Sequence, residues 1–496
     1  GQTMTLGGEL IATGQGAFWA GSNINLSGKI TAPELIDIQA GNAELGGAQD
    51  GAVSADSETL LRAKGTSGQI SISAGEYGGD IRLDKSSLEA TSQVSLKAPS
   101  SKIISDNTDG SNNHGLINTN TLKAEAETGF TAYTDISFAD IVLNDTGDIK
   151  LNNTGALELT KSLAADGKII VENLGAVTVG QVATLGISDR NDIILKTFKI
   201  DGQSADLDIN TLSAGGRGDI TLGIHGVIRQ TSGVTSGDNL TVLTNGAVTA
   251  LTAINSLNLQ TNSAGNVHLT QKENLVGNKL TLDFVKVLDG KFELVSLDSD
   301  GAVDIADVKL GTAREANDII ITAQKDILVR RVQAGIPKSK DTVINTPGDI
   351  FLTSKQGSIS ESYTDQEVDI IADEASFVAK TGITDLEVSL NRLAKAKSDS
   401  GDISIFESDS GTGKGLNIGL VETGKNIGST VEIQTDNLLY VGSDSTVRGD
   451  TIRLTSKQAS VQVDTPTSGS GLDYTAGIAF NAADVLRLYQ FFNAPE

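Results

Sequence analysis

The stretch GDIKLNNTGALELTKSLAADGKIIVENLGAVTV, residues 147–179, contains one short pattern four times. In each copy, a Gly and one further residue precede two apolar residues that are separated by a single position: GDIKL, GALEL, GKIIV and GAVTV. Apolar residues two apart face the same side of a β-strand. Each copy therefore predicts a short strand with one buried face, preceded by a turn.

The same pattern recurs along most of the chain, with Asn in place of Gly in some copies and one extra residue before the first apolar position in others. Further copies are GSNINL (21–26), GQISI (68–72), GDIRL (79–83), NDIIL (191–195), GDITL (218–222), GDNLTV (237–242), GNVHL (265–269), GAVDI (301–305), NDIII (317–321), GDIFL (348–352), GDISI (401–405) and GDTIRL (449–454). Gly can adopt positive φ, and Asp or Asn can hydrogen-bond to the backbone of its own turn. Gly-Asp is therefore interpreted as the turn that precedes each strand.

The spacing of the copies indicates how the strands are arranged. The first apolar positions of successive units lie roughly 20 to 27 residues apart, at Ile149, Ile169, Ile193, Ile220 and Leu240. A second strand follows about eight residues after Ile149 and after Ile169. A coil of this length with two or three short strands is typical of a solenoid.

Parallel stacking of such coils buries their Ile, Leu and Val side chains in one central core and pairs the backbones at about 4.8 Å. The sequence thus predicts an all-β protein, a right-handed parallel β-helix, with the hand taken from the general preference of parallel crossovers. The competing fold is an array of antiparallel β-sandwiches, which predicts turn signals every ~8–12 residues and no sustained longer period. Over residues 147–270 the β-helix is clearly favoured.

The clarity of the repeat suggests five regions. We expect less regular coils with loop insertions in 1–146, a regular β-helix in 147–359, irregular coils or an insertion outside the helix in 360–400, β-helix again in 401–470, and a C-terminal cap in 471–496. In the cap, apolar residues follow helical spacing at Val485, Leu488, Tyr489 and Phe492. A short amphipathic helix is expected there, either covering the last coil or docking a following domain.

Composition excludes several classes of protein. Among 496 residues there is no Cys, one Met, one Trp and three His, which argues against disulfides, thiol chemistry, a buried cofactor and a metal cluster. A net charge of −25 argues against nucleic-acid partners. No apolar run of about 18 residues is present, so membrane insertion is not expected. No secretory signal is visible and the chain begins at Gly1, which fits either a removed leader or a fragment.

The GDIxL and GxLxL units, with polar turns such as LNNTGALELT (151–160), make the chain resemble the filamentous-haemagglutinin-like exoproteins of two-partner secretion in Gram-negative bacteria. The resemblance implies a right-handed parallel β-helix, export through an outer-membrane partner, and work as an adhesin or stalk. The family's secretion motif contains Asn-Pro, and no Asn-Pro occurs here. An interior fragment of a longer exoprotein and a solenoid of another lineage therefore both remain open.

Two Arg-Gly-Asp tripeptides are candidate receptor-binding sites, Arg217-Gly218-Asp219 and Arg448-Gly449-Asp450. In both, Gly-Asp directly precedes a predicted strand and belongs to the repeat. Receptor binding also requires the tripeptide at the tip of a protruding loop. The interpretation as strand-preceding turns is therefore favoured over receptor binding.

Candidates for catalysis or metal binding are few. Asp219, His225 and Arg229 fall within one coil, but the paired carboxylates of a polysaccharide hydrolase are missing nearby. His114 and His268 are isolated, so no zinc site and no cofactor are expected. The many turn Asp and Asn residues allow weak Ca²⁺ binding. Two basic segments, 329–340 and 391–398, are either solvated loops or contacts for an anionic polysaccharide.

The function expected from these observations is that of an extracellular adhesin or stalk, secreted or held at a bacterial cell surface, and not that of an enzyme. Its partners would be an extracellular polysaccharide or a cell-surface receptor, with a role in cell adhesion or biofilm cohesion. Two alternatives stay open: a polysaccharide-degrading β-helix enzyme or phage tailspike, and the stalk of a toxin-delivery exoprotein.

Overall fold

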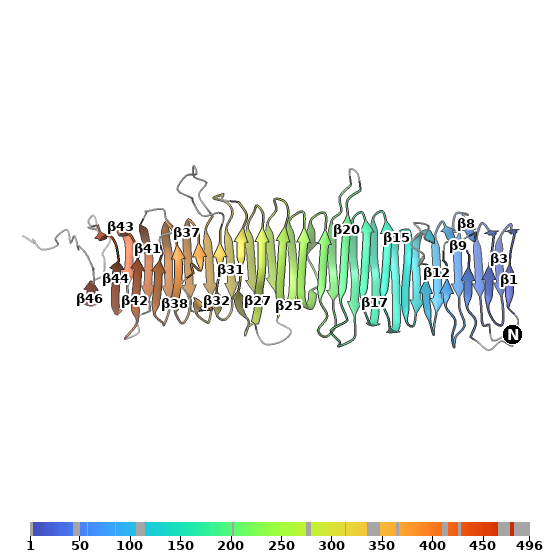
Figure 1. Ribbon diagram of the computed structural model, residues 1–496, viewed down its shortest axis with the longest axis horizontal. Helices are drawn as coiled ribbons and strands as arrows, with labels where there is room; N and C mark the ends of the chain where they lie inside the picture. Colours follow the sequence, from blue (N-terminus) through green and yellow to red (C-terminus); the bar gives the residue numbers. More distant parts are fainter. Residues whose placement is uncertain are drawn as a thin grey trace, which may run out of the picture. The chain divides into compact units, whose positions relative to one another are not determined.

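The computed structural model describes residues 3–42, 50–56, 58–84, 86–105, 115–200, 203–273, 279–312, 314–334, 348–363, 367–408, 415–424 and 428–464, and the backbone of 477–480. The chain divides into two compact units, Gly1–Asn245 and Gly246–Glu496. Both consist of β-strands joined by turns, and the described residues include no helix (Figure 1). A long apolar helix that could cross a membrane is accordingly not found among them.

The first unit is built from short strands at its beginning and longer ones after residue 115. Its strands are β1 (Met4–Leu6), β2 (Glu9–Ile11), β3 (Gln15–Trp19), β4 (Ile24–Leu26), β5 (Lys29–Thr31), β6 (Leu35–Gln39), β7 (Val53–Ala55), β8 (Leu60–Ala63), β9 (Gln69–Ser73), β10 (Ile81–Arg82), β11 (Ser87–Ala90), β12 (Gln93–Ala98), β13 (Lys102–Ile104), β14 (Leu116–Ala126), β15 (Gly129–Thr146), β16 (Ile149–Thr154), β17 (Leu157–Asp166), β18 (Ile169–Leu174), β19 (Val177–Thr184), β20 (Ile193–Phe198), β21 (Leu207–Ser213), β22 (Ile220–Ile224), β23 (Ile228–Gln230) and β24 (Thr235–Thr244).

The second unit follows the same plan. Its strands are β25 (Val248–Thr261), β26 (Val267–Gln271), β27 (Lys279–Val287), β28 (Phe292–Ser296), β29 (Ala302–Ile305), β30 (Val308–Leu310), β31 (Ile319–Ala323), β32 (Ile327–Val329), β33 (Val332–Gln333), β34 (Ile350–Ser354), β35 (Ile359–Glu361), β36 (Ile370–Ile371), β37 (Glu374–Ala379), β38 (Ile383–Ser389), β39 (Arg392–Ser398), β40 (Ile403–Glu407), β41 (Leu416–Thr423), β42 (Thr430–Thr435), β43 (Leu439–Arg448), β44 (Thr451–Ser456), β45 (Val461–Val463) and β46 (Gly477–Phe480).

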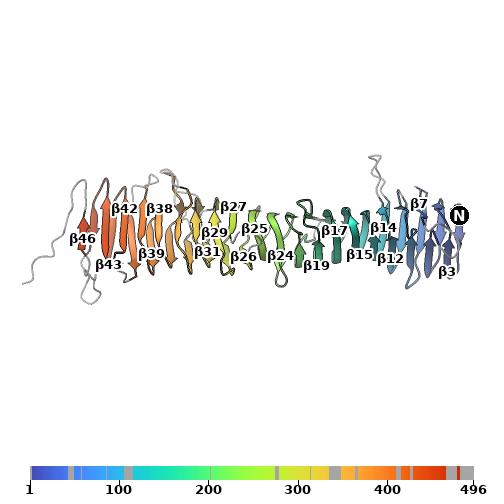
Figure 2. The same cartoon turned by 90° about the horizontal axis from the view of Figure 1, so that it is seen from below.

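Every strand pairing that the structure describes is parallel, and it joins a strand to the equivalent strand of the next coil. One column of paired residues in the first unit is Ile149, Ile169, Ile193, Ile220 and Leu240. These are the residues whose spacing predicted the coils. At the start of the unit, β1, β2 and β3 pair with β4, β5 and β6, so each coil there has three strands. Both views show the strands of each unit following one another in chain order (Figures 1 and 2). The predicted parallel β-helix is confirmed, and the antiparallel sandwich is excluded.

The core follows from the alternation of apolar and polar residues in each strand. In β16, Ile149 and Leu151 are buried, while Lys150 between them is exposed. The same alternation places Ile, Leu and Val side chains inside nearly every coil. Each fully buried side chain of this size contributes roughly 1.5–3 kcal/mol. Stacking therefore provides the hydrophobic core that a single coil is too small to form.

A buried polar ladder crosses three coils of the first unit. The Asn153 side chain is 5% exposed and that of Asn173 is fully buried. Asn153 Oδ1 accepts hydrogen bonds from Thr134 Oγ1 at 2.8 Å and from the Ile136 backbone N–H at 3.0 Å. Its Nδ2 donates to Asn173 Oδ1 at 2.8 Å. The sequence reading placed Asn153 in a turn, but it is an inward-facing residue of β16. Satisfied ladders of this kind fix the register between coils.

Four glycines of the Gly-Asp turns serve a different purpose from the predicted one, whereas Gly79 has the predicted positive φ, 116°. Gly147, Gly218, Gly348 and Gly401 do not have positive φ. A Cβ at these positions would lie 2.0, 2.1, 1.8 and 1.7 Å from a backbone oxygen of the preceding coil. The predicted reason, positive φ, is therefore wrong at these four positions. Glycine is needed there because neighbouring coils approach too closely to leave room for a side chain.

The close approach of neighbouring coils at Gly401 predicts that Gly401→Ala destabilises the protein. The new Cβ would meet the Thr381 carbonyl oxygen at 1.7 Å, and a backbone atom cannot move aside cheaply. Overpacking of this kind costs about 1–3 kcal/mol. We expect the denaturant midpoint to fall accordingly. Gly14→Ala is the control, because no atom lies within 4 Å of its Cβ position and its φ is not positive. Equal midpoints for the two variants would contradict the close approach.

The weak repeat between 360 and 400 has a local cause. Strands β36 to β40 keep the parallel pairing, but the register shifts between Ala375 and Ser376 and again between Ile383 and Leu386. Asp385, inside the second shift, has a φ of 58°. Such bulges displace the apolar positions along the sequence without ending the coil. The C-terminal helix expected around 481–493 lies outside the described residues.

Candidate functional site

Ion pairs between neighbouring coils cover much of the exterior of each unit. In the first unit, Lys168 lies 2.8 Å from Asp192, and Lys196 lies 2.9 Å from Glu172. The hydrogen bond to Asp192 raises the pKa of Lys168 above its usual value. In the second unit, Lys397 lies 2.8 Å from Glu422. Single exposed pairs contribute little, about 0–1 kcal/mol. Their repetition nevertheless means that many charged side chains of the described residues already have a partner on a neighbouring coil.

The three residues considered for catalysis are engaged separately. Asp219 Oδ1 accepts from Asn239 Nδ2 at 2.8 Å, and His225 Nδ1 lies 2.7 Å from the Thr197 carbonyl oxygen. Arg229 lies 2.9 Å from Asp206. Asp219 precedes β22 and His225 follows it, so the strand separates them by about 20 Å at ~3.3 Å per residue. The structure does not bring these residues together as a catalytic group.

Both Arg-Gly-Asp tripeptides lie beside strand ends. Gly218 is buried and Asp219 is half-buried at the start of β22, while Arg217 is exposed. In the second copy, Arg448 ends β43 and lies 3.9 Å from Glu422, and Asp450 accepts a hydrogen bond from the Gly428 N–H at 2.8 Å. Each Asp is thus occupied by the turn or the neighbouring coil.

The remaining sequence candidates are also placed by the β-helix. His268 faces outward from β26, with Nδ1 3.2 Å from Glu293 Oε2. Segment 391–398 is largely β39, and not a loop as one interpretation had it. Its Arg392 and Lys397 form ion pairs with Glu374 and Glu422. His114 and residues 335–340 of the other basic segment lie outside the described residues.

A group of three carboxyls lies in the second unit. Carboxylate oxygens of Glu361, Asp369 and Glu387 lie within 4.8 Å of one another. Asp369 is 2% exposed, and its Oδ2 accepts the Glu387 backbone N–H at 3.0 Å. Burial and the adjacent carboxyls of Glu387 and Glu361 raise the pKa of Asp369 to about 8. Ca²⁺ takes about 6–8 oxygen ligands. Three carboxyls alone supply fewer oxygen ligands than Ca²⁺ needs, and weak Ca²⁺ binding stays a prediction.

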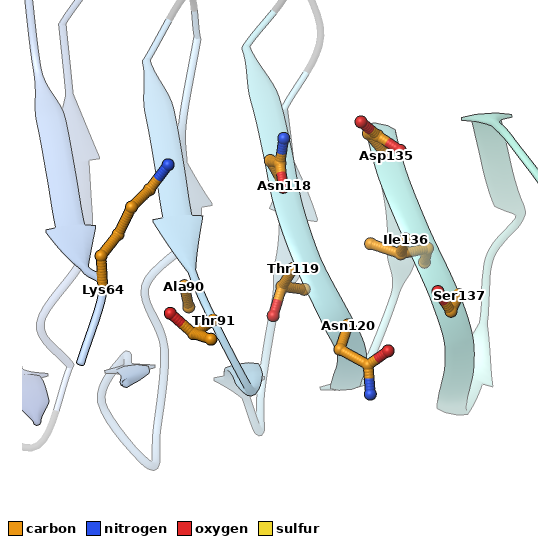
Figure 3. A pocket seen from close by; sticks show the side chains of 9 residues that line it. All are labelled: Lys64, Ala90, Thr91, Asn118, Thr119, Asn120, Asp135, Ile136 and Ser137. Atoms are coloured by element: carbon orange, nitrogen blue, oxygen red, sulfur yellow. The ribbon is translucent and has the colours of Figure 1, made fainter. Parts of the chain in front are cut away.

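A hollow of about 360 Å³ lies on the surface of the first unit. Its lining comes from four successive coils: Lys64 after β8, Ala90 and Thr91 at the end of β11, Asn118 to Asn120 in β14, and Asp135 to Ser137 in β15 (Figure 3). Apart from Ala90 and Ile136, every lining side chain is polar. This polar hollow is the candidate binding site.

A difference in strand length opens the polar hollow. Between the paired positions Glu89↔Asn118 and Gln93↔Thr121, one coil has the three residues 90–92 and the next has only the two residues 119–120. The extra residue interrupts the ladder between β14 and the coil before it. Bulges of this type recur next to functional sites.

Sequence reasoning missed the polar hollow because it lies in the region interpreted as irregular coils. The available signal was the polar run NTNT, residues 118–121, between Ile117 and Leu122. Four consecutive polar residues interrupt a strand that is otherwise alternating. That pattern does not indicate that residues from three other coils lie beside residues 118–120.

Comparisons with known proteins add no relative. Searches of family models, of curated proteins and of solved structures give no match for this chain. The fold is that of a parallel β-helix, and the polar hollow lies on the surface of its first unit.

Proposed function

We propose that the chain is an adhesive or stalk segment of a secreted bacterial surface protein. The observation that carries the proposal is how each unit obtains its rigidity. Parallel backbone hydrogen bonds and buried aliphatic side chains stabilise the interior of each unit. On its surface, ion pairs such as Lys168–Asp192 link neighbouring coils. This construction needs no disulfide, and the chain has no Cys. It suits a support that carries binding surfaces away from a cell.

The surroundings of such a protein follow from the resemblance in the repeats and from charge. Export through an outer-membrane partner and a location outside the cell belong to the proposal. The net charge of −25 favours a soluble, self-repelling surface. Proposed partners are an extracellular polysaccharide or a cell-surface receptor, in cell adhesion or biofilm cohesion.

Catalysis on a polysaccharide is the less favoured function. It would need carboxylates converging at the spacing of a glycosidase pair, about 5–10 Å apart on an open face. Asp219, His225 and Arg229 are instead separated along the coil and bonded to other residues. The Glu361, Asp369 and Glu387 group is centred on a carboxyl that is 2% exposed.

Attachment of coated beads tests the proposal. Beads carrying the intact folded chain are applied to Gram-negative bacterial cells, to extracted matrix polysaccharide and to cultured epithelial cells. We expect more beads to be retained on at least one surface than for matched beads carrying the urea-unfolded chain. Retention equal to the unfolded control on all three surfaces would overturn the adhesive function.

A further inference from the structure

The polar hollow brings together several exposed polar side chains that have no hydrogen-bond partner among the described residues. Elsewhere, polar side chains of neighbouring coils commonly bond to each other, as Lys196 does to Glu172. Around the polar hollow, Asn118, Asn120, Asp135 and Ser137 form no side-chain hydrogen bond with any other residue that the structure describes. Two amides, a carboxylate and a hydroxyl from adjacent coils therefore face one depression with their bonding capacity open to a ligand.

One positively charged side chain, that of Lys64, lies at the edge of the polar hollow. Lys64 Nζ lies 2.7 Å from Glu89 Oε2, and Arg62 holds the same carboxylate at 2.9 Å. The hydrogen bond from Arg62 lowers the pKa of Glu89, so this carboxylate is charged and fixes the position of Lys64. An ammonium has three donors, and Glu89 takes one of them. The positive charge of Lys64 is balanced locally by Glu89 and Asp135, so the depression has no excess positive charge.

These groups fit the chemistry of an uncharged sugar. Each amide offers a donor and an acceptor, the carboxylate accepts, and the serine hydroxyl does both. Paired sugar hydroxyls require this mixture. Groups on adjacent coils lie about 4.8 Å apart, a separation that one sugar ring with its hydroxyls can bridge. The hollow is at the lower end of the ~300–1,000 Å³ range of small-ligand sites, which suits one or two sugar units.

Other ligand classes fit less well. A polyanion would meet a chain of net charge −25 and a site containing Asp135. A peptide would need a free strand edge or an apolar pocket. β14 is paired with β15 on one side and with β11 and β12 on the other, and the lining offers no large apolar depression. We propose that the polar hollow is a binding site for a neutral saccharide unit of an extracellular polysaccharide. This inference rests on the proposed adhesive function and names its ligand.

Two asparagine substitutions test the inference. Asn118→Ala and Asn120→Ala each remove an exposed amide that has no bond within the described residues, so both variants should fold as the wild type does. The control is Asn25→Ala, since Asn25 is likewise an exposed strand asparagine without a described side-chain bond and lies in β4, three coils before the coil of Asn118. Thermal unfolding of all three variants should match the wild type.

Binding is measured by calorimetric titration with short neutral oligosaccharides of glucose, galactose, mannose and N-acetylglucosamine, and with oligogalacturonate as the acidic comparison. We expect at least one neutral oligosaccharide to bind, and Asn118→Ala and Asn120→Ala to weaken it about 5- to 10-fold each, the effect of one lost hydrogen bond. Asn25→Ala should bind as the wild type does. Neutral oligosaccharide binding that is unchanged in both hollow variants would overturn the site, as would a preference for oligogalacturonate.

The two proposals can fail independently. Bead attachment that persists in Asn118→Ala and Asn120→Ala, together with no neutral saccharide binding, would remove the polar hollow as a ligand site and leave the adhesive function standing. Saccharide binding that is lost in both variants, in a protein whose beads attach to nothing, would support the site and remove the adhesive function.

Discussion

Replacing Phe292 by Ala is expected to lower the unfolding free energy by about 3–5 kcal/mol. Phe292 is fully buried in β28, and it pairs with Val267 of the preceding coil and Ile319 of the following one. It is among the largest side chains in a core formed mainly by Ile, Leu, Val and Ala. Its removal leaves a cavity that the neighbouring aliphatic side chains cannot fill, because the backbone ladders on both sides hold the coils at fixed separation.

The loss of stability caused by Phe292→Ala should be local as well as large. In a solenoid, each coil is stabilised by its two neighbours, so a weakened coil opens together with them. Amide hydrogen exchange should therefore accelerate first in β26, β28 and β31. Phe351→Ala is the matched control, because Phe351 is an exposed aromatic of β34, 37% accessible to solvent. Similar losses from both substitutions, or faster exchange spread evenly over the chain, would argue against a core built from stacked coils.

Asp369 is expected to make the second unit less stable as the pH rises. Burial, and then the carboxyls of Glu387 and Glu361, raise the pKa of Asp369 to about 8, whereas an unfolded Asp titrates near ~3.9. Between these values, the folded chain keeps a proton that the unfolded chain has released. The stabilisation is thus complete at low pH and is lost as the pH rises from about 4 to about 8. Asp349, whose pKa burial raises to about 6, contributes in the same direction.

Asp369→Asn should remove most of this dependence. Asn is neutral at every pH and keeps an oxygen to accept the Glu387 N–H, which lies 3.0 Å away. The variant should match the wild type near pH 4 and exceed it by a few kcal/mol near pH 9, because each pH unit of the window contributes about 1.4 kcal/mol at most. Denaturant midpoints measured from about pH 4 to about pH 9 give the difference between the two proteins.

The control for this pH series is Asp300→Asn, since Asp300 is an exposed carboxylate with 67% of its side chain accessible. Its stability curve should run parallel to that of the wild type. If the Asp369→Asn curve also ran parallel, Asp369 would not hold a proton in the folded chain.

The fold could be predicted from the sequence because it is repetitive and local. The pairs Ile149↔Ile169 and Ile193↔Ile220 are spaced in the sequence as they are stacked in the coils. Two apolar residues on one face of a strand are enough to define each repeat. The winding hand and the C-terminal helix stay predictions.

The sequence-based predictions that are wrong concern contacts between coils, because the order of residues along the chain does not show which coils lie against each other. The sequence suggests backbone conformation as the reason for Gly401, but the nearby Thr381 carbonyl oxygen requires it. The sequence predicts a turn at Asn153, but its partners Thr134 and Asn173 hold it in the interior. The polar hollow was missed for the same reason, because Lys64, Thr91, Asn118 and Asp135 are distant in sequence and meet only when four coils stack.

We propose that this β-helix binds polysaccharide and leaves it intact. The most direct measurement incubates the intact protein with neutral and acidic bacterial polysaccharides, separates the bound fraction, and determines its chain length by size-exclusion chromatography. We expect neutral polysaccharide to be retained at the chain length of the untreated sample. Shortened chains, or new reducing ends that increase with time, would contradict the claim and show a polysaccharide-degrading enzyme instead.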